Sequence, residues 1–177
     1  MQSYSIVFRS IGVIRTPHRN PSETPIQPVF AKGVPGAVEL DPEFQTALKD
    51  LKGFSHIHLL YHFHRSEAIR LHVAPYLDSQ VRGLFATRAP HRPNKIGLSL
   101  VRLLRIRDNV LHIEDADMLD GTPLLDIKPY IQRFDSRSDA RSGWQEAVPD
   151  ETAFSIGSRT KAPPGKDASQ SDGSDPK

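Results

Sequence analysis

The stretch GFSHIHLLYHFHRS (residues 53–66) alternates apolar and polar side chains with a period of two over residues 56–64, interrupted at Leu60. One face carries the apolar residues Ile57, Leu59, Tyr61 and Phe63. The opposite face carries half of the eight histidines in the chain, namely His56, His58, His62 and His64. Because successive side chains of a β-strand point to opposite faces, the pattern predicts a strand with an apolar core face and a histidine-lined outer face.

These histidines raise the question of a metal site. Two histidines at i and i+2 on a strand share a face, a geometry that zinc and iron sites use. The nearest acids, Asp50 and Glu67, lie outside the strand, and His58 and His62 would be about 13 Å apart at ~3.3 Å per residue. We therefore expect no metal, and interpret the histidines as half-buried, hydrogen-bonded residues. A metal-dependent β-barrel enzyme that uses this strand is the alternative.

Length and composition restrict the class of protein. The chain has 177 residues, 37% of them hydrophobic, which favours one folded domain. No apolar run approaches the ~20 residues that span a bilayer, and the N-terminus lacks the pattern of a signal peptide. We expect a cytoplasmic protein without a membrane partner. The absence of cysteine excludes disulfides, cysteine-ligated metals and thiolate nucleophiles.

Outward from the histidine stretch, short strands dominate the prediction. A helix is expected at about 41–52, where Asp41 suits the cap and Pro42 the first turn. Its apolar stripe comprises Phe44, Ala47, Leu48 and Leu51. Further strands are predicted within residues 5–16, 83–87, 96–108, 109–115 and 122–129, and the proline-rich segment 17–29 predicts an irregular loop. The fold class is mainly β: a barrel-like single domain with one clear helix and long loops.

Charge is segregated along the chain. Residues 82–107 hold seven cations and no acid, and residues 108–126 hold six acids and no cation. Prolines stiffen the basic loop FATRAPHRPNKIGLS (85–99), which suits recognition of an anion or nucleotide, although arginines in solvent are also consistent with it. The acidic hairpin EDADMLDGTPLLDIKPY (114–130) could hold ribose hydroxyls or an ammonium group, or simply make turns. The residues alone indicate a β-rich nucleotide- or RNA-binding protein, with an enzyme as one option.

Four segments together resemble the TrmO family, also called TsaA-like, YaeB-like or VirR-like proteins: IGVIRTPH (11–18), LKGFSHIHLLYHFHR (51–65), FATRAPHRPNKIGLSLV (85–101) and DMLDGTPLLDIKPYI (117–131). The resemblance implies a single-domain YaeB-like β-barrel over about 1–135. It implies an S-adenosylmethionine-dependent tRNA methyltransferase that converts N6-threonylcarbamoyladenosine (t6A) at position 37 to its N6-methyl form, m6t6A. It also implies a homodimer with the cofactor near the subunit interface. A methyltransferase or regulator that binds the cofactor but acts on another substrate is the alternative.

The resemblance also implies site residues. Cofactor contacts are expected from Pro25, Ile26, Gln27, His64, Arg65, Arg88, Leu98, Glu114, Asp115, Ala116 and Asp117. Ile26 and Arg65 stand where the family often has Arg and Gln. The catalytic residue is unknown, and His64, Asp117 and Asp120 are the candidate bases. Contacts with tRNA are expected from Arg92, Lys95, Arg102 and Arg105.

The C-terminal part of the chain loses the strand pattern. Residues 136–156 keep Trp144 and Phe154, which we expect to pack on the core or on a dimer partner. Residues 157–177 have almost nothing to bury and predict a disordered tail.

Overall fold

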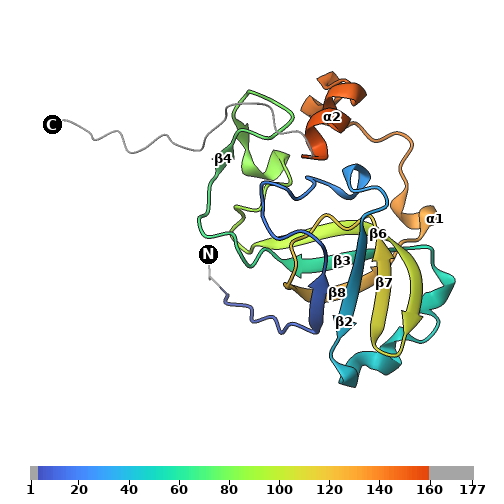
Figure 1. Ribbon diagram of the computed structural model, residues 1–177. Coiled ribbons are helices and arrows are strands. Elements are labelled where there is room, and N and C mark those ends of the chain that lie inside the picture. Colours follow the sequence, from blue (N-terminus) through green and yellow to red (C-terminus); the bar gives the residue numbers. More distant parts are fainter. Residues whose placement is uncertain (1–3, 160–177) are drawn as a thin grey trace.

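A computed structural model describes residues 4–159, and its main feature is a closed barrel of strands in the order β1-β2-β7-β6-β3-β8 (Figure 1). The barrel strands are β1 (Gly12–Arg15), β2 (Pro35–Leu40), β3 (His56–His62), β6 (Ile96–Arg107), β7 (Val110–Glu114) and β8 (Thr122–Pro129). All six neighbouring pairs are antiparallel. The predicted mainly β, barrel-like fold is confirmed.

Shorter elements surround the barrel. They are η1 (Pro28–Phe30), η2 (Pro42–Leu48), η3 (Leu51–Gly53), β4 (His72–Val73), β5 (Arg82–Gly83), η4 (Leu84–Ala86), α1 (Gln132–Asp135), η5 (Gly143–Ala147) and α2 (Asp150–Gly157), where η marks a 3-10 helix. The long loops and α2 gather at one end of the barrel, and the segment 41–53 lies at the other (Figure 1). Over the described residues, no helix has the length and apolarity needed to cross a membrane.

The strand β3 has the predicted period of two. Ile57, Leu59 and Tyr61 are buried, while the intervening residues are partly exposed. In the antiparallel pairing with β6, Leu59 lies opposite Ser99 and Tyr61 lies opposite Gly97. The predicted apolar core face is therefore the inner wall of the barrel, and a polar group reaches it from each of the two strands.

The prediction missed β2, which joins β1 to β7 and so helps to close the barrel. The alternation of apolar and polar residues that would predict β2 is short, because only Val38 and Leu40 are buried, with the exposed Glu39 between them. Pro35 and Gly36 at its start are typical of loops and hid this alternation.

The helix expected at about 41–52 is present as two short 3-10 segments, η2 and η3, rather than as one α-helix. Asp41 makes no capping hydrogen bond through its side chain, and Asp50 takes a left-handed backbone with φ 67° that separates the two segments. Of the expected stripe, Leu48 is buried and Ala47 is exposed. Leu51 is partly buried against the core, but one fully buried residue of the stripe does not fix an amphipathic α-helix against the barrel.

Two strand predictions also need correction. Within the segment 83–87, residues 84–86 form the 3-10 turn η4, because the two buried residues, Leu84 and Thr87, are three positions apart and the Thr87 hydroxyl donates to the Leu84 carbonyl at 2.8 Å. Within residues 5–16, the strand is confined to Gly12–Arg15.

The C-terminal extension packs against other segments of the same chain. The Phe154 ring meets Phe30 edge to face at 5.3 Å, and Trp144 Nε1 donates to the Ala86 carbonyl at 2.8 Å. Gly157 is buried at the end of α2. The predicted disordered tail over 157–177 falls outside the described residues from residue 160 onward.

Replacing Gly97 with Ala should destabilise the barrel. An added Cβ would lie 2.2 Å from Cε2 of Tyr61 and 2.5 Å from Cζ, inside van der Waals contact with a buried ring. Overpacking of this kind costs about 1–3 kcal/mol in the free energy of unfolding, measurable by urea titration. Gly53→Ala is the matched control, because nothing lies within 4 Å of its added Cβ. Equal stability of the two variants would contradict this packing.

Candidate functional site

Asp117 is a buried carboxylic acid at the loop end of the barrel. It follows the last residue of β7 by three positions, and its residue is only 8% exposed. Ser99 Oγ donates to Asp117 Oδ1 at 2.6 Å, and Tyr61 Oη lies 3.1 Å from Ser99 Oγ. Three polar groups from three segments thus form one hydrogen-bonded chain inside an otherwise apolar wall.

Burial makes this carboxyl a weaker acid than an exposed aspartate. Removal from water raises the pKa of Asp117 to about 7, although the Ser99 bond and the charge of Arg88 oppose the rise. Burial also raises the pKa of Tyr61, so its hydroxyl stays protonated. Near neutral pH, Asp117 therefore exists in both protonation states, as a group that accepts or releases a proton must.

Hydrogen bonds hold the segment around Asp117 against the N-terminal loops. Gly33 N–H donates to Asp115 Oδ1 at 2.9 Å, and Ala116 N–H donates to the Val34 carbonyl at 3.2 Å. Thr16 Oγ1 donates to the Met118 carbonyl at 2.7 Å, and His18 Nε2 lies 3.0 Å from the Ala116 carbonyl. The acidic segment 115–118 is thereby fixed in an irregular conformation, with φ 68° at Asp115.

Arg88 and Gln27 connect the proline-rich loop to the basic loop. Arg88 Nη1 donates to Gln27 Oε1, and the charge of Arg88 acts on Asp117. The C-terminal extension contacts both loops: Ile26 N–H donates to the Gly157 carbonyl at 3.0 Å, and Trp144 bonds Ala86 close to Arg88. Gln27, Arg88 and Asp117, three of the residues expected to contact the cofactor, thus lie in one region.

A second group of predicted residues lies around Asp120. One oxygen of this carboxylate accepts Thr16 N–H at 3.2 Å, and the other pairs with Arg19. Arg65 Nη1 donates to the Arg19 carbonyl at 2.9 Å. This group borders an open pocket of about 550 Å³, lined by Arg15, Thr16, Pro17, Arg19, Pro35, Gly36, Ala37 and Asp120.

His64 lies just beyond β3, in the turn that leaves the barrel. Its Nδ1 is 3.4 Å from Thr122 Oγ1. Burial, followed by the charge of Arg65, lowers the pKa of His64 below its ordinary value. His64 is therefore neutral at physiological pH.

Several predicted residues lie apart from the carboxyl. Leu98 is on the outer face of β6 and is 52% exposed. Glu114 pairs with Arg102 at 2.7 Å across β6 and β7. Pro25 and Ala116 are buried, and both backbone groups of Ala116 are already bonded, its N–H to Val34 and its carbonyl to His18.

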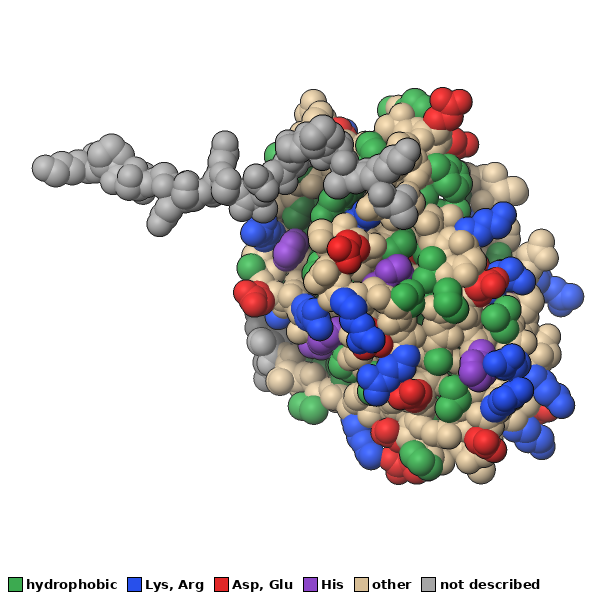
Figure 2. Space-filling view, viewed as in Figure 1, with side chains coloured by type: hydrophobic (Ala, Val, Ile, Leu, Met, Phe, Trp, Pro, Cys, Tyr) green, Lys and Arg blue, Asp and Glu red, His purple; other side chains and the backbone are tan. Residues whose placement is uncertain are grey.

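The predicted tRNA-binding cations do not form one uniform surface. Arg92 Nη1 donates to the Thr87 carbonyl at 2.9 Å, and Lys95 Nζ lies 3.5 Å from the Glu67 carbonyl. Arg105 is exposed near the far end of β6. Lys and Arg side chains are interspersed with Asp and Glu on the face drawn in Figure 2.

The histidines of β3 take part in packing. His58 and His56 lie beside the Tyr130 ring, with centroid distances of 5.8 and 6.4 Å. In the part of the chain that the structure describes, no three His, Asp or Glu residues are grouped so as to hold a metal ion.

Sequence reasoning missed Tyr61 and Ser99 as parts of the site, together with Thr16 and His18. Ser99 carried a usable signal, because it is a hydroxyl on the inward face of β6 among Gly97 and Val101. A buried hydroxyl requires a partner, and its partner is the acid that the sequence placed in the acidic hairpin.

Asp117→Asn should change how stability depends on pH. The native state binds this proton more tightly than the unfolded chain, so the stabilisation is complete below about pH 4 and is lost as pH rises through about 7. Relative to Asp117→Asn, the wild type should lose roughly 3 kcal/mol of unfolding free energy between about pH 4.5 and about pH 8. Urea titrations at the two pH values measure this. Asp126→Asn, at a half-exposed carboxylate paired with Lys128, is the control and should lose as much stability as the wild type, whereas a wild-type loss no larger than that of Asp117→Asn would exclude the raised pKa.

Comparisons with known proteins identify the family of this chain. The family model for the tRNA-methyltransferase O N-terminal domain matches residues 13–136. A probable S-adenosyl-L-methionine-binding protein from Pyrococcus abyssi is 53% identical over 141 residues, which cover 80% of this chain and 77% of that protein. The tRNA (adenine(37)-N6)-methyltransferase of Escherichia coli is 36% identical over 158 residues, covering 82% of this chain and 66% of that protein.

The fold comparison gives the same family. The crystal structure of TrmO from Pseudomonas aeruginosa superposes with a TM-score of 0.68 at 39% identity, covering 80% of this chain. The match covers 63% of that crystallised chain, slightly less than two thirds of its length. From the family model, the sequence identities and the shared barrel, the chain belongs to the TrmO family.

Proposed function

We propose that the chain is an S-adenosylmethionine-dependent methyltransferase that methylates N6 of t6A at position 37 of tRNA, giving m6t6A. Family membership supports methyl transfer, and the names of the P. abyssi and E. coli relatives support the cofactor and a tRNA adenine at position 37. The observation that carries the proposal is the buried Asp117 carboxyl, held by Ser99 and lying under the charge of Arg88.

The residues at this end of the barrel fit the cofactor chemically. S-adenosylmethionine supplies an electrophilic methyl group on a sulfonium, and it also carries an ammonium and a carboxylate. Arg88 and the Gln27 amide offer donors for an anionic end. The carboxylates and backbone carbonyls of the segment 114–117 offer acceptors for cationic groups. His64 and Arg65 would contribute at the turn after β3.

Asp117 is the strongest of the three candidate bases. The N6–H of t6A must lose its proton, and a carboxyl with a pKa of about 7 accepts one at neutral pH. Both oxygens of Asp120 are already engaged, with Thr16 and Arg19. Ser99 keeps the acceptor in place by donating to Oδ1, so the carboxylate does not have to be ordered on substrate binding.

A homodimer is part of the proposal. Leu98 and Ser99 are adjacent on β6, but Ser99 faces the barrel interior whereas Leu98 is exposed on the outside. One cofactor cannot readily use both faces of a single wall. In a homodimer, the outer face of β6 of one subunit could lie at the loop end of its partner. One cofactor could then contact Leu98 of one subunit and the residues around Asp117 of the other. Leu104, half exposed on the same strand, adds apolar surface for such a contact.

The cations on the basic loop are proposed to hold tRNA through its phosphates. Arg102 already pairs with Glu114, whereas Arg92 and Lys95 bond only to backbone carbonyls. Binding through phosphates should weaken steeply as salt rises, because condensed counterions are released. A tRNA substrate also implies a cytoplasmic location.

Removal of Arg88 should weaken cofactor binding. A hydrogen bond to a charged group contributes about 1.5–3 kcal/mol, so Arg88→Ala should raise the Kd for S-adenosylmethionine by about 10- to 150-fold. Isothermal titration calorimetry measures this directly. Arg133→Ala, at an exposed arginine on α1, is the matched control, and an unchanged Kd in both variants would exclude Arg88 from the cofactor site.

Loss of the gene should remove m6t6A from tRNA. Mass spectrometry of tRNA nucleosides from a deletion strain should show t6A accumulating in its place. The wild-type chain and Asp126→Asn should restore m6t6A, and Asp117→Asn should restore little, because it lacks a proton acceptor. Unchanged m6t6A in the deletion strain would contradict the proposed substrate. Full restoration by Asp117→Asn would contradict the role of this carboxyl.

A further inference from the structure

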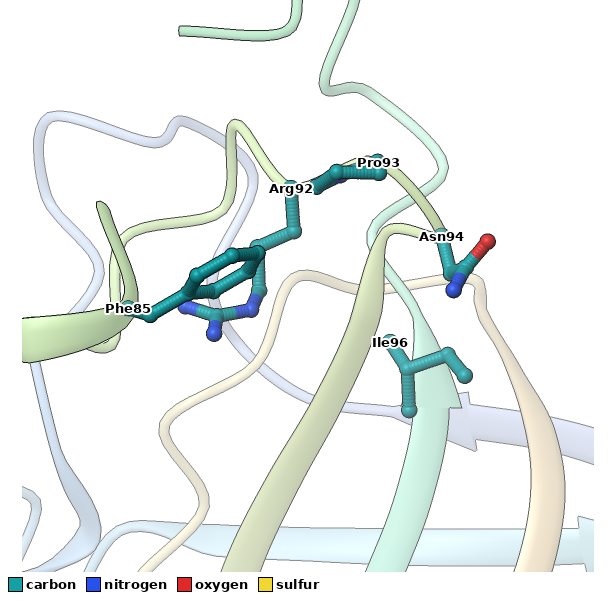
Figure 3. A pocket seen from close by; sticks show the side chains of 5 residues that line it. All are labelled: Phe85, Arg92, Pro93, Asn94 and Ile96. Carbon is teal, nitrogen blue, oxygen red and sulfur yellow. The ribbon is translucent and has the colours of Figure 1, made fainter. Parts of the chain in front are cut away.

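The basic loop contains a pocket that none of the predicted cofactor residues line. Its volume is about 400 Å³, and its walls are formed by Phe85, Arg92, Pro93, Asn94 and Ile96 (Figure 3). This volume lies within the range of small-ligand sites. In the close view, the Phe85 ring and the Arg92 guanidinium lie together on one side, Asn94 lies on the other, and Ile96 lies below them.

Phe85 is an aromatic ring held in solvent by a rigid turn. It is 77% exposed, whereas Leu84 beside it is 2% exposed and anchors η4 in the structure. Leu84 N–H donates to the Leu71 carbonyl at 2.9 Å, and Thr87 closes the turn onto the Leu84 carbonyl. The ring therefore projects because its neighbours are fixed, and its open face is available for stacking.

Arg92 is held beside this ring. Its Cζ lies 5.5 Å from the Phe85 centroid, and Nη1 donates to the Thr87 carbonyl at 2.9 Å. A guanidinium has five N–H donors, and this bond uses one of them. Because the guanidinium of Arg92 is already held in place, little side-chain entropy is lost when its remaining donors bind a ligand. A guanidinium presents its donors in the geometry that recognises phosphate.

Asn94 completes the pocket with an uncommitted amide. Its side chain is exposed, and no hydrogen-bond partner is found for it among residues 4–159. An amide presents a donor and an acceptor side by side, the pattern that reads the edge of a nucleobase. Ile96 provides an apolar floor beneath.

Charge selects among the ligands that such a pocket would accept. Arg92 lines the pocket and Arg88 and Lys95 lie on the same loop, which carries no acid, so the loop favours an anionic ligand. An acidic peptide would use these cations but would leave the aromatic face and the amide without a role. An unpaired nucleotide uses all of them: a base to stack, an edge to read and a phosphate to bind.

We propose that Phe85, Arg92 and Asn94 form a subsite for one unpaired nucleotide of the RNA substrate. Its base stacks on Phe85, its phosphate meets Arg92, and its edge meets Asn94. This inference rests on the proposed function and deepens it, because it names a contact outside the methylated residue. Unpaired bases occur in RNA loops and are absent from a duplex, so the subsite favours a loop over a helix.

Phe85→Ala tests this subsite, with Phe134→Ala as the matched control at another exposed phenylalanine, on α1. The probes are an anticodon stem-loop carrying t6A and an RNA duplex of the same length, with Kd measured by fluorescence anisotropy. Stacking of a single base corresponds to about 5- to 150-fold in affinity. Phe85→Ala should lose that much for the stem-loop and little for the duplex, Phe85→Trp should retain binding, and Phe134→Ala should match the wild type.

Three results would overturn the subsite. Equal stem-loop affinity of Phe85→Ala and Phe134→Ala would exclude stacking. An equal loss of S-adenosylmethionine affinity in Phe85→Ala, measured by calorimetry, would assign the pocket to the cofactor. A change of oligomeric state in Phe85→Ala by sedimentation, with RNA affinity intact, would assign it to a protein contact. If the wild type binds S-adenosylmethionine but no tRNA, the proposed function fails as well, and this outcome is distinct from the other three.

Discussion

A hydrogen-bonded chain of Tyr61, Ser99 and Asp117 links β3, β6 and the loop after β7 inside the barrel. An ionisable carboxyl inside an apolar wall is costly unless it is hydrogen-bonded, and its proton is then held far more tightly than in water. The barrel meets this requirement because β3 and β6 pair in a register that brings Tyr61 opposite Gly97, with Ser99 two residues along. The absence of a side chain at Gly97 leaves room for the phenol ring, and the hydroxyls then reach the carboxyl.

The loops at this end of the barrel hold Asp117 in place and present side chains at the surface. Asp117 stays at its place because the flanking residues bond to Thr16, His18, Gly33 and Val34, which lie beyond the ends of β1 and before β2. The same end of the barrel receives Gln27 and Arg88, whose loops are contacted by α2 and by Trp144. Most of these contacts are to backbone groups, so irregular loops are fixed without regular secondary structure. The proposed chemistry and the proposed nucleotide subsite use side chains that these loops present.

Much of the barrel was predictable, and the reasons are physical. Period two identified β3 and β6 because one face of each strand is buried and the other is not. The motif resemblance named Gln27, Arg88 and Asp117, which the fold then brought to one end. By contrast, β2 was missed because its two buried residues give too weak an alternation of apolar and polar side chains. The segment 41–53 was predicted as an α-helix because helix propensity is a local property, and it does not indicate that this segment crosses the end of a barrel as two 3-10 turns. The partnership of Tyr61 with Asp117 depends on strand register across 56 positions of sequence, which local patterns do not contain.

The proposed role of the buried, titratable Asp117 carboxyl is to serve methyl transfer to a tRNA adenosine. Its most direct test is transfer of a labelled methyl group from S-adenosylmethionine to tRNA by the purified wild type, followed by digestion and identification of the labelled nucleoside. We expect label in m6t6A when the tRNA carries t6A, a much lower rate with Asp117→Asn, and a rate that rises with pH through about 7. Binding of both cofactor and tRNA by the wild type without label in m6t6A would contradict this role.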